Sequence, residues 1–408
     1  MIATSLLSTA VAAAGLAASP AAAADVVTQR IGGVDRYDTS VRLTQDAFPR
    51  GAKTVFIASG EEFADAISAG TAAAQIGSPV LLTRSGALPS GVRAEIKRLN
   101  PDSIVIVGGT ARISAAVETA LQDQASSVSR IAGADRYLTA AAVSKKYFKK
   151  TPTSHTFVAS GENFADALSA SSASKRLGAP VLLTKPTSLP AATAAELERL
   201  DAERLFVVGS TQAINGATYK AIQEYISFRT YRLNGANRYE TSAAVSQASF
   251  NSADTVYLAT GANFADALSA VPAAGGRGPV LLVGKSNLTT QVCQEVYRLK
   301  PKRIVTIGGT AAIEDTVADF IATKCVNGEA EPAPTTAPTT TPKPTPTSPS
   351  VPVASGDTPP DTEITCSMFP TQPQAQQYYD YWVRKGFGDH FRLDPDGDGT
   401  ACEDRPRA

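Results

Sequence analysis

The sequence predicts an α/β protein made of three homologous domains, each with a doubly wound parallel sheet. Two observations lead to this prediction: a pattern that recurs about every 100 residues, and an alternation of short apolar runs with helical periodicity inside each copy. An Arg-Tyr pair marks the period, because it occurs at residues 36, 136 and 238, which are 100 and 102 residues apart. A period of this length is that of a domain and is too long for a solenoid repeat.

Strands and helices alternate within the first copy. Its apolar runs have little polar interruption, which is typical of strands buried on both faces of a sheet. The predicted strands are Thr54–Ala58, Pro79–Thr83 and Ser103–Val107, and the predicted helices are Glu61–Ile76, Pro89–Leu99 and Ile113–Gln122. The other copies repeat the PVLL run from Pro180 and Pro279 and the glycine after the last strand at Gly209 and Gly308. Strand followed by helix, repeated, favours parallel sheets with right-handed crossovers.

Composition limits the classes of function. With 408 residues and 43% hydrophobic content, the chain is long enough for several folded domains. Lys plus Arg and Asp plus Glu are equal at 38 each, so no overall basic field is available to hold nucleic acid, and an anionic partner must be met locally. The chain has only two histidines, His155 and His390. We therefore do not expect a histidine-based metal site or a histidine general base.

The N-terminal residues 1–24 are expected to be an export signal. Ile2 to Ala24 is a run of Ala, Leu, Val and Ser that ends in three alanines before Asp25, which fits a small-residue cleavage rule. The basic start usual for such a segment is missing, which leaves open an upstream start codon or a trimmed sequence. A membrane anchor is the alternative, but alanine dominates and the clearly apolar stretch is short.

The stretch SGENFADALS from Ser160 recurs almost unchanged from Ser59 and from Thr260. In each copy a buried strand ends here and a helix begins, so Ser160 is expected to cap the helix, with Asp166 near its first turns. Such a turn lies at the carboxyl edge of the sheet, where open α/β sheets bind ligands.

Asp166 has a second interpretation, which applies equally to Asp65 and Asp266. These carboxylates either contact a ligand or only stabilise the local structure, for instance by pairing with an arginine of the same copy, such as Arg136 with Asp166. The turn at Gly108-Gly109 resembles a phosphate loop only in its glycines, since neither G-x-G-x-x-G nor a Walker lysine follows. Tight strand-to-helix packing explains those glycines.

The Arg-Tyr pair is another sequence feature that all three copies share. Arginine binds phosphate or carboxylate in bidentate fashion, and tyrosine stacks on sugar rings. The alternative is that the tyrosines belong to the core and the arginines to salt bridges beside them. The candidate ligand-contacting residues are therefore Arg36, Tyr37, Arg136, Tyr137, Arg238 and Tyr239.

The threefold pattern of G-x-x-R-Y-x-T, SGE-x-FADA, PVLLT and I-V-x-x-GG closely resembles the cell wall binding repeat type 2 of exported Gram-positive proteins. The resemblance spans roughly residues 28 to 325. It implies tandem Rossmann-like domains that close a pseudo-threefold ring and bind an anionic wall polymer noncovalently, of teichoic or secondary-polysaccharide type. Asn237 replaces the acid of Asp35 and Asp135, Ser210 replaces a glycine, and Val283 replaces a threonine. These departures argue against equal binding by the three copies.

Composition changes abruptly after Asn327. Residues 328–362 are dominated by Pro and Thr, a composition that buries no core and favours an extended polyproline-like linker. Its Thr and Ser residues are candidates for O-glycans in an exported protein.

The last segment contains the start of an EF-hand-like loop. DPDGDGT, from Asp394, sets carboxylates at the first, third and fifth positions and glycine at the sixth. Asp394, Asp396 and Asp398, with the carbonyl of Thr400, are the expected calcium ligands. The acid expected at the twelfth position is absent, since Arg405 stands there, and Glu403 is the nearest substitute. A solvated acidic turn is the alternative.

Together with Cys366, Phe369 and a helix over residues 375–381, this loop resembles the Excalibur extracellular calcium-binding domain over about residues 363 to 405. The resemblance implies calcium as the cofactor and Glu403 as a further ligand. The four cysteines predict two disulfides, Cys366–Cys402 and Cys293–Cys325, because export favours oxidation and each pair lies within one module. Free thiols are the alternative.

The sequence therefore predicts a secreted, noncatalytic protein of the cell wall or cell surface that binds no nucleic acid. The expected segments are a signal at 1–24, wall-binding repeats at 25–127, 128–228 and 229–327, a linker at 328–362 and a calcium module at 363–408. The alternatives are an envelope enzyme, such as a wall hydrolase or calcium-dependent nuclease, and a surface adhesin. Asp389-His390 alone supplies no nucleophile or metal set for an enzyme.

Overall fold

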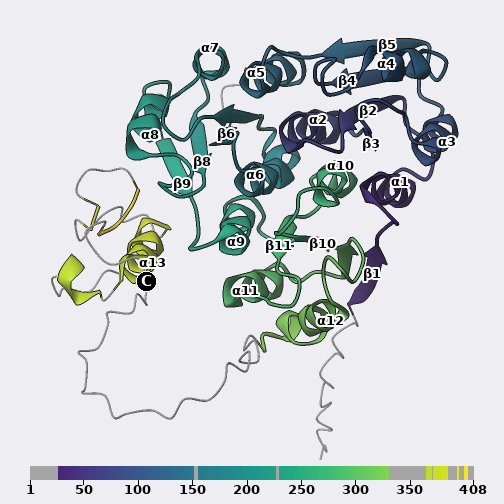
Figure 1. Ribbon diagram of the computed structural model, residues 1–408. Helices are drawn as coiled ribbons and strands as arrows, with labels where there is room; N and C mark the ends of the chain where they lie inside the picture. Colours follow the sequence, from purple (N-terminus) through teal and green to yellow (C-terminus); the bar gives the residue numbers. More distant parts are fainter. Residues whose placement is uncertain are drawn as a thin grey trace, which may run out of the picture.

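The computed structural model describes residues 26–150, 155–226, 229–329, 364–369, 371–384, 393–394 and 399–402. Three α/β units fill residues 26–329 and surround a centre where α2 (Phe63–Ile76), α6 (Phe164–Leu177) and α10 (Ala270–Ala274) pack together (Figure 1). This arrangement confirms the predicted set of three parallel-sheet α/β repeats. The predicted export signal and nearly all of the predicted linker lie outside the described residues.

Each unit contains one four-stranded parallel sheet. The sheets have the strand orders β3-β2-β4-β5, β7-β6-β8-β9 and β1-β12-β10-β11. The strands are β1 Val27–Ile31, β2 Thr54–Ser59, β3 Val80–Thr83, β4 Ser103–Val107, β5 Ser127–Ile131, β6 His155–Ser160, β7 Val181–Thr184, β8 Arg204–Val208, β9 Arg229–Leu233, β10 Thr255–Thr260, β11 Val280–Val283 and β12 Arg303–Ile307.

The sheets are offset from the sequence repeats, because each takes one edge strand from the repeat that follows. Strand β5 opens the second repeat but pairs with β4 of the first, and β9 of the third pairs with β8 of the second. Strand β1 closes the ring, since it pairs in parallel with β12 from Val27 opposite Arg303 to Ile31 opposite Ile307. Ring closure therefore joins the two ends of the repeat region through backbone hydrogen bonds.

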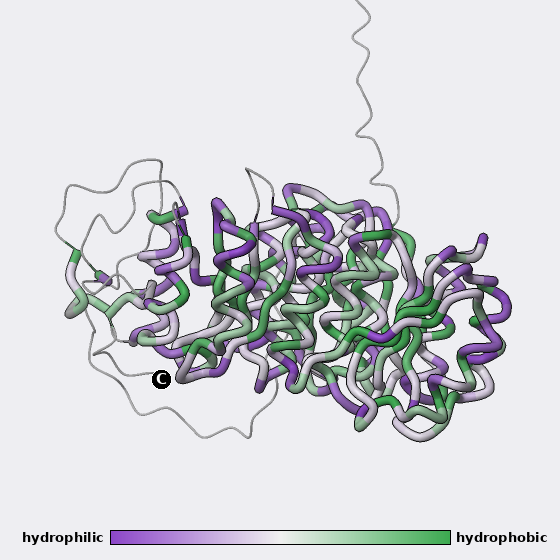
Figure 2. The backbone as a smooth tube through the Cα atoms, turned by 90° about the horizontal axis from the view of Figure 1, so that it is seen from above, coloured by the Kyte–Doolittle hydropathy of each residue, from purple (hydrophilic) through white to green (hydrophobic). Residues whose placement is uncertain are grey.

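Helices bury both faces of the sheets. Phe56 and Ile57 are neighbours on β2 whose side chains point to opposite faces, and both are 0% exposed. The covering helices are α1 Arg36–Ala47, α3 Ser90–Leu99, α4 Ala115–Gln122, α5 Arg136–Tyr147, α7 Ala191–Leu200, α8 Gly216–Gln223, α9 Arg238–Ser249, α11 Thr290–Leu299 and α12 Asp315–Thr323. Apolar stretches run through the interior of this flattened body, and polar stretches lie along its edges (Figure 2).

Side-chain caps fix where several helices begin. Asp35, Asp135 and Asn237 cap α1, α5 and α9, and each accepts hydrogen bonds from backbone N–H groups of the first turn. The expectation that Ser160 caps the central helix is wrong. Asn163 caps α6 instead, while the Ser160 hydroxyl accepts a hydrogen bond from the Glu162 N–H inside the preceding turn.

The central helix of the third repeat is shorter than its counterparts. It consists of a 3₁₀ turn, η1 (Ala267–Ser269), followed by the five residues of α10, whereas α2 and α6 have 14 residues each. Pro272 lies within α10, and Gly275, in the left-handed conformation, ends it. Proline lacks the amide donor that helix propagation needs, which explains the shortening.

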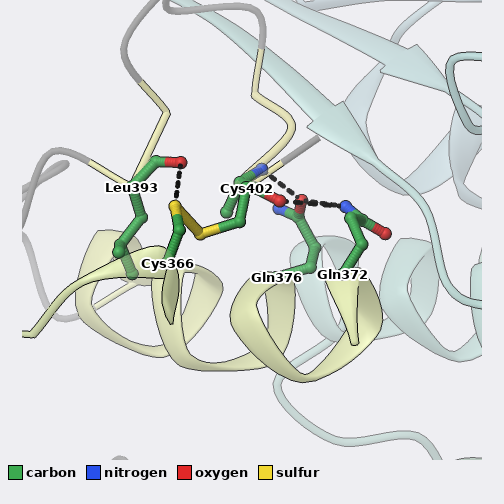
Figure 3. The surroundings of a disulfide bond; sticks show 6 residues. Cys366, Gln372, Gln376, Leu393 and Cys402 are labelled. Atoms are coloured by element: carbon green, nitrogen blue, oxygen red, sulfur yellow. Dashed lines mark hydrogen bonds between the residues drawn. A yellow bond between two sulfur atoms is a disulfide. The ribbon is translucent and has the colours of Figure 1, made fainter. Parts of the chain in front are cut away.

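Both predicted disulfides are present. Cys293–Cys325 links α11 to the turn η2 (Cys325–Asn327), and Cys366–Cys402 links the two ends of the C-terminal module. In that module α13 (Gln372–Arg384) points Gln372 and Gln376 toward the second disulfide, and both side chains hydrogen-bond to the backbone of Ala401 (Figure 3). Among the described residues, no helix is long and apolar enough to cross a membrane.

Candidate functional site at the centre of the ring

Three phenylalanines meet where the three repeats converge. Phe63 and Phe164 begin α2 and α6, and Phe264 occupies the same place before η1. The ring centroids are 6.4 Å apart for Phe63 and Phe164, 5.9 Å for Phe63 and Phe264, and 5.7 Å for Phe164 and Phe264. All three rings are partly exposed, so they form a small apolar surface, the phenylalanine triangle, at the carboxyl edges of the sheets.

An arginine from the next repeat lies over each of these rings. The guanidinium carbon of Arg136 is 5.5 Å from the Phe63 centroid, that of Arg238 is 5.4 Å from Phe164, and that of Arg36 is 5.8 Å from Phe264. These distances fit cation–π contact. Each arginine is the first residue of its helix, so three cations stand at helix N-termini, where a positive charge is electrostatically unfavourable.

Backbone carbonyls orient the three arginines. Each donates from Nη1 to the glycine carbonyl of its own repeat, at 2.5 Å for Arg36 to Gly60, 2.5 Å for Arg136 to Gly161 and 2.7 Å for Arg238 to Gly261. None of the three forms an ion pair with a carboxylate among the described residues. The alternative interpretation, that these arginines belong to salt bridges, is therefore wrong for the described part of the chain. Their remaining donors are available to an anion.

A cavity of about 510 Å³ opens beside the triangle. It is lined by the three phenylalanines, by Arg36 and by Arg238. The loops before α6 and η1 complete it with Glu162, Asn163, Ala262 and Asn263. The site therefore combines apolar ring faces with cationic groups in one concave surface, as ligand sites do.

The tyrosines of the Arg-Tyr pairs lie beneath this surface. Tyr37 and Tyr137 are 6% and 7% exposed, and Tyr239 is half-buried. A Cβ placed on Gly60 would lie 2.8 Å from the Tyr37 ring, and one on Gly161 would lie 2.7 Å from Tyr137, so only glycine fits above these rings. Burial also raises the pKa of both phenols. Tyr37 and Tyr137 therefore act as packing residues.

Basic side chains extend the cationic character outward. The Arg84 guanidinium lies 4.7 Å from the Tyr37 ring centroid and 3.6 Å from a carboxylate oxygen of Asp35. Lys185 lies 6.0 Å from the Tyr137 ring centroid in the second repeat. The rim of the site thus has a cation-over-tyrosine contact in the first two repeats.

The three FADA carboxylates face the glycine turns. A Cβ on Gly108 would lie 2.7 Å from Asp65 Oδ2, and a Cβ on Gly308 would lie 2.8 Å from Asp266 Oδ2, and both glycines have positive φ values, of 117° and 92°. These glycines are therefore required by close packing and by backbone conformation. Among the alternatives left open for the aspartates, this geometry supports the structural one.

Arginines of the next repeat lie near two of these aspartates, Asp65 and Asp166, without forming ion pairs with them. Burial raises the pKa of Asp166 to about 6, and the nearby guanidinium of Arg238 opposes that shift. Burial likewise raises the pKa of Asp65, and the Thr139 side chain, Arg112 of its own repeat and Arg136 of the next repeat oppose that shift. The alternative in which Asp166 pairs with Arg136 of its own copy is wrong, since its charged neighbour is Arg238 of the next repeat.

The described part of the calcium loop is consistent with an EF-hand start. Asp394 is 6% exposed, and its Oδ2 accepts hydrogen bonds from the Gly399 N–H at 2.8 Å and the Tyr379 hydroxyl at 3.0 Å. Gly399, at the sixth position, has a φ of +88°, which the sharp turn of such a loop needs. Thr400 is buried, whereas the candidate ligands Asp396, Asp398 and Glu403 lie outside the described residues.

The phenylalanine triangle is the part of the site that the sequence interpretation missed. A signal was present, because phenylalanine precedes Ala-Asp-Ala in all three copies. Apolar residues at helix starts usually serve the core, so sequence alone did not distinguish a shared surface from three separate cores.

Comparison with known proteins adds an independent finding. A model of the family "Cell wall binding domain 2 (CWB2)" matches residues 30–118, 130–219 and 232–318. The chain is 31% identical over 301 residues to the N-acetylmuramoyl-L-alanine amidase LytC of Bacillus subtilis (strain 168), and 26% identical over 297 residues to the amidase enhancer of the same organism. These stretches cover 74% and 72% of this chain, but 59% and 40% of the two relatives.

Two solved structures share the fold. Cwp6 from Clostridium difficile superimposes with a TM-score of 0.68 at 25% identity, covering 73% of this chain and 48% of that one. Cwp8 from the same organism gives a TM-score of 0.67 at 26% identity, covering 74% and 52%. The matched region is about half of each of these structures.

Proposed function

Because the chain belongs to the cell wall binding domain 2 family, we propose that its three repeats attach an exported protein noncovalently to the Gram-positive cell wall. The proposed ligand is an anionic glycopolymer of teichoic or secondary-polysaccharide type. The proposed location is the wall or cell surface.

One observation supports this proposal above the others: three arginines without carboxylate partners among the described residues surround a partly exposed aromatic triangle. Guanidinium groups bind phosphate and carboxylate in bidentate fashion, and ring faces accept the apolar faces of sugars. Arg36, Arg136 and Arg238 keep their positions through carbonyl contacts that leave other N–H groups unused. The site is thus preorganised for an anionic sugar polymer.

Threefold repetition suits a polymeric ligand. A repeating anionic chain presents several equivalent groups, and a second contact made by an already bound chain has a high effective concentration. Contacts that are each weak then add to a strong attachment. We propose that multivalency, rather than one deep pocket, holds the protein on the wall.

We propose that the repeats are noncatalytic. The similarity to the amidase extends over 301 residues, a length comparable with the stretch from residue 30 to residue 318 that the family model matches. In the described residues, the centre of the ring contains arginines, phenylalanines and amides but no nucleophile hydrogen-bonded to a histidine. A role beside a wall amidase, which the names of the two relatives suggest, is the competing proposal.

The C-terminal module is proposed to bind calcium. The described residues of the loop support this proposal. The buried Asp394 carboxylate, a hard oxygen ligand, accepts a hydrogen bond from the Gly399 N–H, as in the first turn of an EF-hand loop. Asp394, Asp396, Asp398, Glu403 and the carbonyl of Thr400 are the proposed ligands. A bound cation would neutralise carboxylates that otherwise repel one another and would stabilise the loop.

Sedimentation with purified walls tests the attachment. The full chain is mixed with Gram-positive walls before and after chemical removal of their anionic glycopolymers, and the bound fraction is measured. We expect sedimentation with intact walls and release at high salt, because exposed charges are screened. Equal binding to stripped walls would contradict a glycopolymer ligand, and solubilisation of the walls by the full chain would contradict a noncatalytic role.

Tryptophan fluorescence tests the calcium proposal in the full chain. The chain has one tryptophan, Trp382, and it is buried in the C-terminal module, so its emission reports on that module alone. We expect a saturable change at roughly 10⁻⁴ to 10⁻³ M calcium, the range of extracellular modules. The variant Asp394→Asn should weaken it at least about tenfold. An unchanged spectrum up to several millimolar would contradict the proposal.

A further inference from the structure

The three arginines at the centre of the ring occupy equivalent positions but unequal electrostatic surroundings. We propose, building on the proposed attachment to an anionic glycopolymer, that one dominant subsite centred on Arg238 anchors the polymer. It takes a single anionic group, phosphate or carboxylate, together with the sugar next to it. The other two positions contribute weaker contacts along the polymer.

The residue that follows each glycine carbonyl makes the first difference. Arg136 donates to the carbonyl of Gly161, which precedes Glu162, and Arg36 donates to that of Gly60, which precedes Glu61. Arg238 donates to the carbonyl of Gly261, and there the next residue is Ala262. Glu61, Glu162 and Ala262 are all exposed, so an exposed acid follows the glycine that bonds to Arg36 or Arg136, and no acid follows the glycine that bonds to Arg238.

The helix caps differ in the same direction. Asp135 and Asp35 cap the helices that begin with Arg136 and Arg36, whereas the neutral Asn237 caps α9. A carboxylate at this position offsets the positive end of the helix and the arginine beside it. Helix α9 therefore starts with an uncharged cap, and the acid of its first turn, Glu240, accepts a hydrogen bond from that cap.

The residue before each phenylalanine completes the pattern. Arg136 lies over Phe63, which follows Glu62, and that carboxylate pairs with Arg112 at 3.0 Å. Arg238 lies over Phe164, which follows the neutral Asn163. The three positions compared are the helix cap, the residue after the bonded glycine and the residue before the covered phenylalanine. For Arg136 all three are acids: Asp135, Glu162 and Glu62. Arg36 has two, Asp35 and Glu61, and Arg238 has none, since its neighbouring acids are instead the buried Asp166 and Glu240 of its own helical turn.

The position of the cavity also favours Arg238 over Arg136. The cavity of about 510 Å³ is lined by Arg238 and Arg36 but not by Arg136, and Ala262 forms part of its wall. Glu162 is its one lining carboxylate. The short side chain of Ala262 leaves open space where the other copies carry a glutamate. The cavity therefore brings two of the three arginines together beside a single lining acid.

The ligand chemistry follows from this arrangement. Two guanidinium groups on one cavity suit an oxyanion, and the rings of Phe164 and Phe264 offer faces to a neighbouring sugar. Phosphodiester-linked polymers and uronate-containing polymers both provide such a group. The subsite recognises the anion with its sugar, and binding measurements distinguish the two sources.

The test adds a carboxylate to the subsite of the full-length protein. Ala262→Glu restores the acid of the other repeats. Ser252→Glu adds the same charge in the exposed loop before β10, at the opposite edge of the sheet. Calorimetry with a glycerol-phosphate oligomer, with an oligogalacturonate and with neutral dextran measures affinity. We expect Ala262→Glu to weaken binding of one anionic probe about tenfold and Ser252→Glu to change it less than about twofold.

A second variant tests the subsite in the opposite direction. Glu162→Ala removes the one lining carboxylate and should tighten binding severalfold, which a misfolded protein cannot do. The proposal is overturned if Ala262→Glu and Ser252→Glu weaken binding equally, or if Glu162→Ala leaves the affinity unchanged. Failure of the unmodified protein to sediment with intact walls would instead overturn the proposed attachment itself, so the two failures are distinguishable.

Discussion

Two threefold sets of arginines differ in what surrounds them. The outer set, Arg30, Arg130 and Arg232, lies on β1, β5 and β9, six residues before the inner set of Arg36, Arg136 and Arg238. Both sets donate to glycine carbonyls. The outer arginines bond to Gly308, Gly108 and Gly209 at 3.0, 2.6 and 3.0 Å.

Two of the three outer arginines differ from the inner set by having a carboxylate as second partner. Arg130 pairs with Glu118 at 2.8 Å and Arg30 pairs with Asp315 at 2.8 Å, while Arg232 lies 4.5 Å from the ring centroid of Tyr219, which takes the place of Glu118. The inner arginines have an aromatic ring but no carboxylate partner among the described residues. A paired arginine stabilises the fold, whereas an arginine without an internal anion is suited to bind an external one.

Removing all three inner arginines should have the largest effect. In Arg36→Ala/Arg136→Ala/Arg238→Ala we expect wall affinity to fall on the order of ten-thousandfold, about 5.5 kcal/mol, because every anion contact and the multivalent gain are lost together. Sedimentation with purified walls over a range of protein concentrations measures this loss. Circular dichroism should show an intact fold.

A matched triple variant controls for net charge. Arg93→Ala/Lys97→Ala/Lys145→Ala removes the same charge from exposed positions on α3 and α5. Its wall affinity should stay within about threefold of the unmodified protein, since long-range effects are screened at physiological salt. A comparable loss in both triple variants would show that total charge, and not the centre of the ring, governs attachment.

Single substitutions in the two sets should separate stability from binding. Arg130→Ala should lower the free energy of unfolding by about 4 kcal/mol, because it leaves Glu118 and the carbonyls of Gly108 and Ile113 without their donors. Arg136→Ala should cost at most about 1 kcal/mol, since it removes a cation from a helix N-terminus. Denaturant unfolding of both variants measures this. The comparison fails if Arg136→Ala is the more destabilising change.

The buried carboxylate beneath Arg238 should make stability depend on pH. The pKa of Asp166 is about 6 in the folded protein, against about 3.9 in an unfolded chain. The folded state therefore binds more protons between these values, and the free energy of unfolding falls as pH rises from about 4 to about 6. The loss is about 2 to 3 kcal/mol above pH 6.

Asp166→Asn isolates this contribution, because an amide of the same shape does not titrate. The difference between the unfolding free energies of the unmodified protein and Asp166→Asn should grow through the same pH window and level off above it. Urea unfolding at half-unit pH steps measures the difference. Parallel profiles from pH 4 to 7 would contradict a raised pKa at this site.

The smallest effect is expected for Arg238→Lys. Lysine keeps the charge but loses the planar fork that binds oxyanions in bidentate fashion and stacks on Phe164. Affinity for the anionic probe should fall about fivefold, near 1 kcal/mol. Arg238→Gln provides the neutral comparison in the same calorimetric assay. Equal losses in the two variants would mean that geometry, not charge, carries the contact.

Much of the fold follows from local patterns. The three copies, their parallel strands, their helices and both disulfides agree with the sequence predictions, because apolar periodicity and cysteine placement are properties of short segments or single modules. The strand β1 and its helix α1 were not assigned from sequence. Three polar residues, Thr28, Gln29 and Arg30, separate Val27 from Ile31, so the strand signal is weak.

The sequence alone thus determined the repeating unit and the residue types carried by each copy: the arginine, the phenylalanine and the FADA carboxylate. Tertiary structure decided which copies meet. Arg30 contacts Gly308 across 278 residues, and each inner arginine covers the ring of the preceding repeat rather than its own. Local periodicity specifies how a segment folds and which face it buries, but the strand exchange that closes the ring depends on backbone pairing between distant segments, for which short stretches of sequence carry no register.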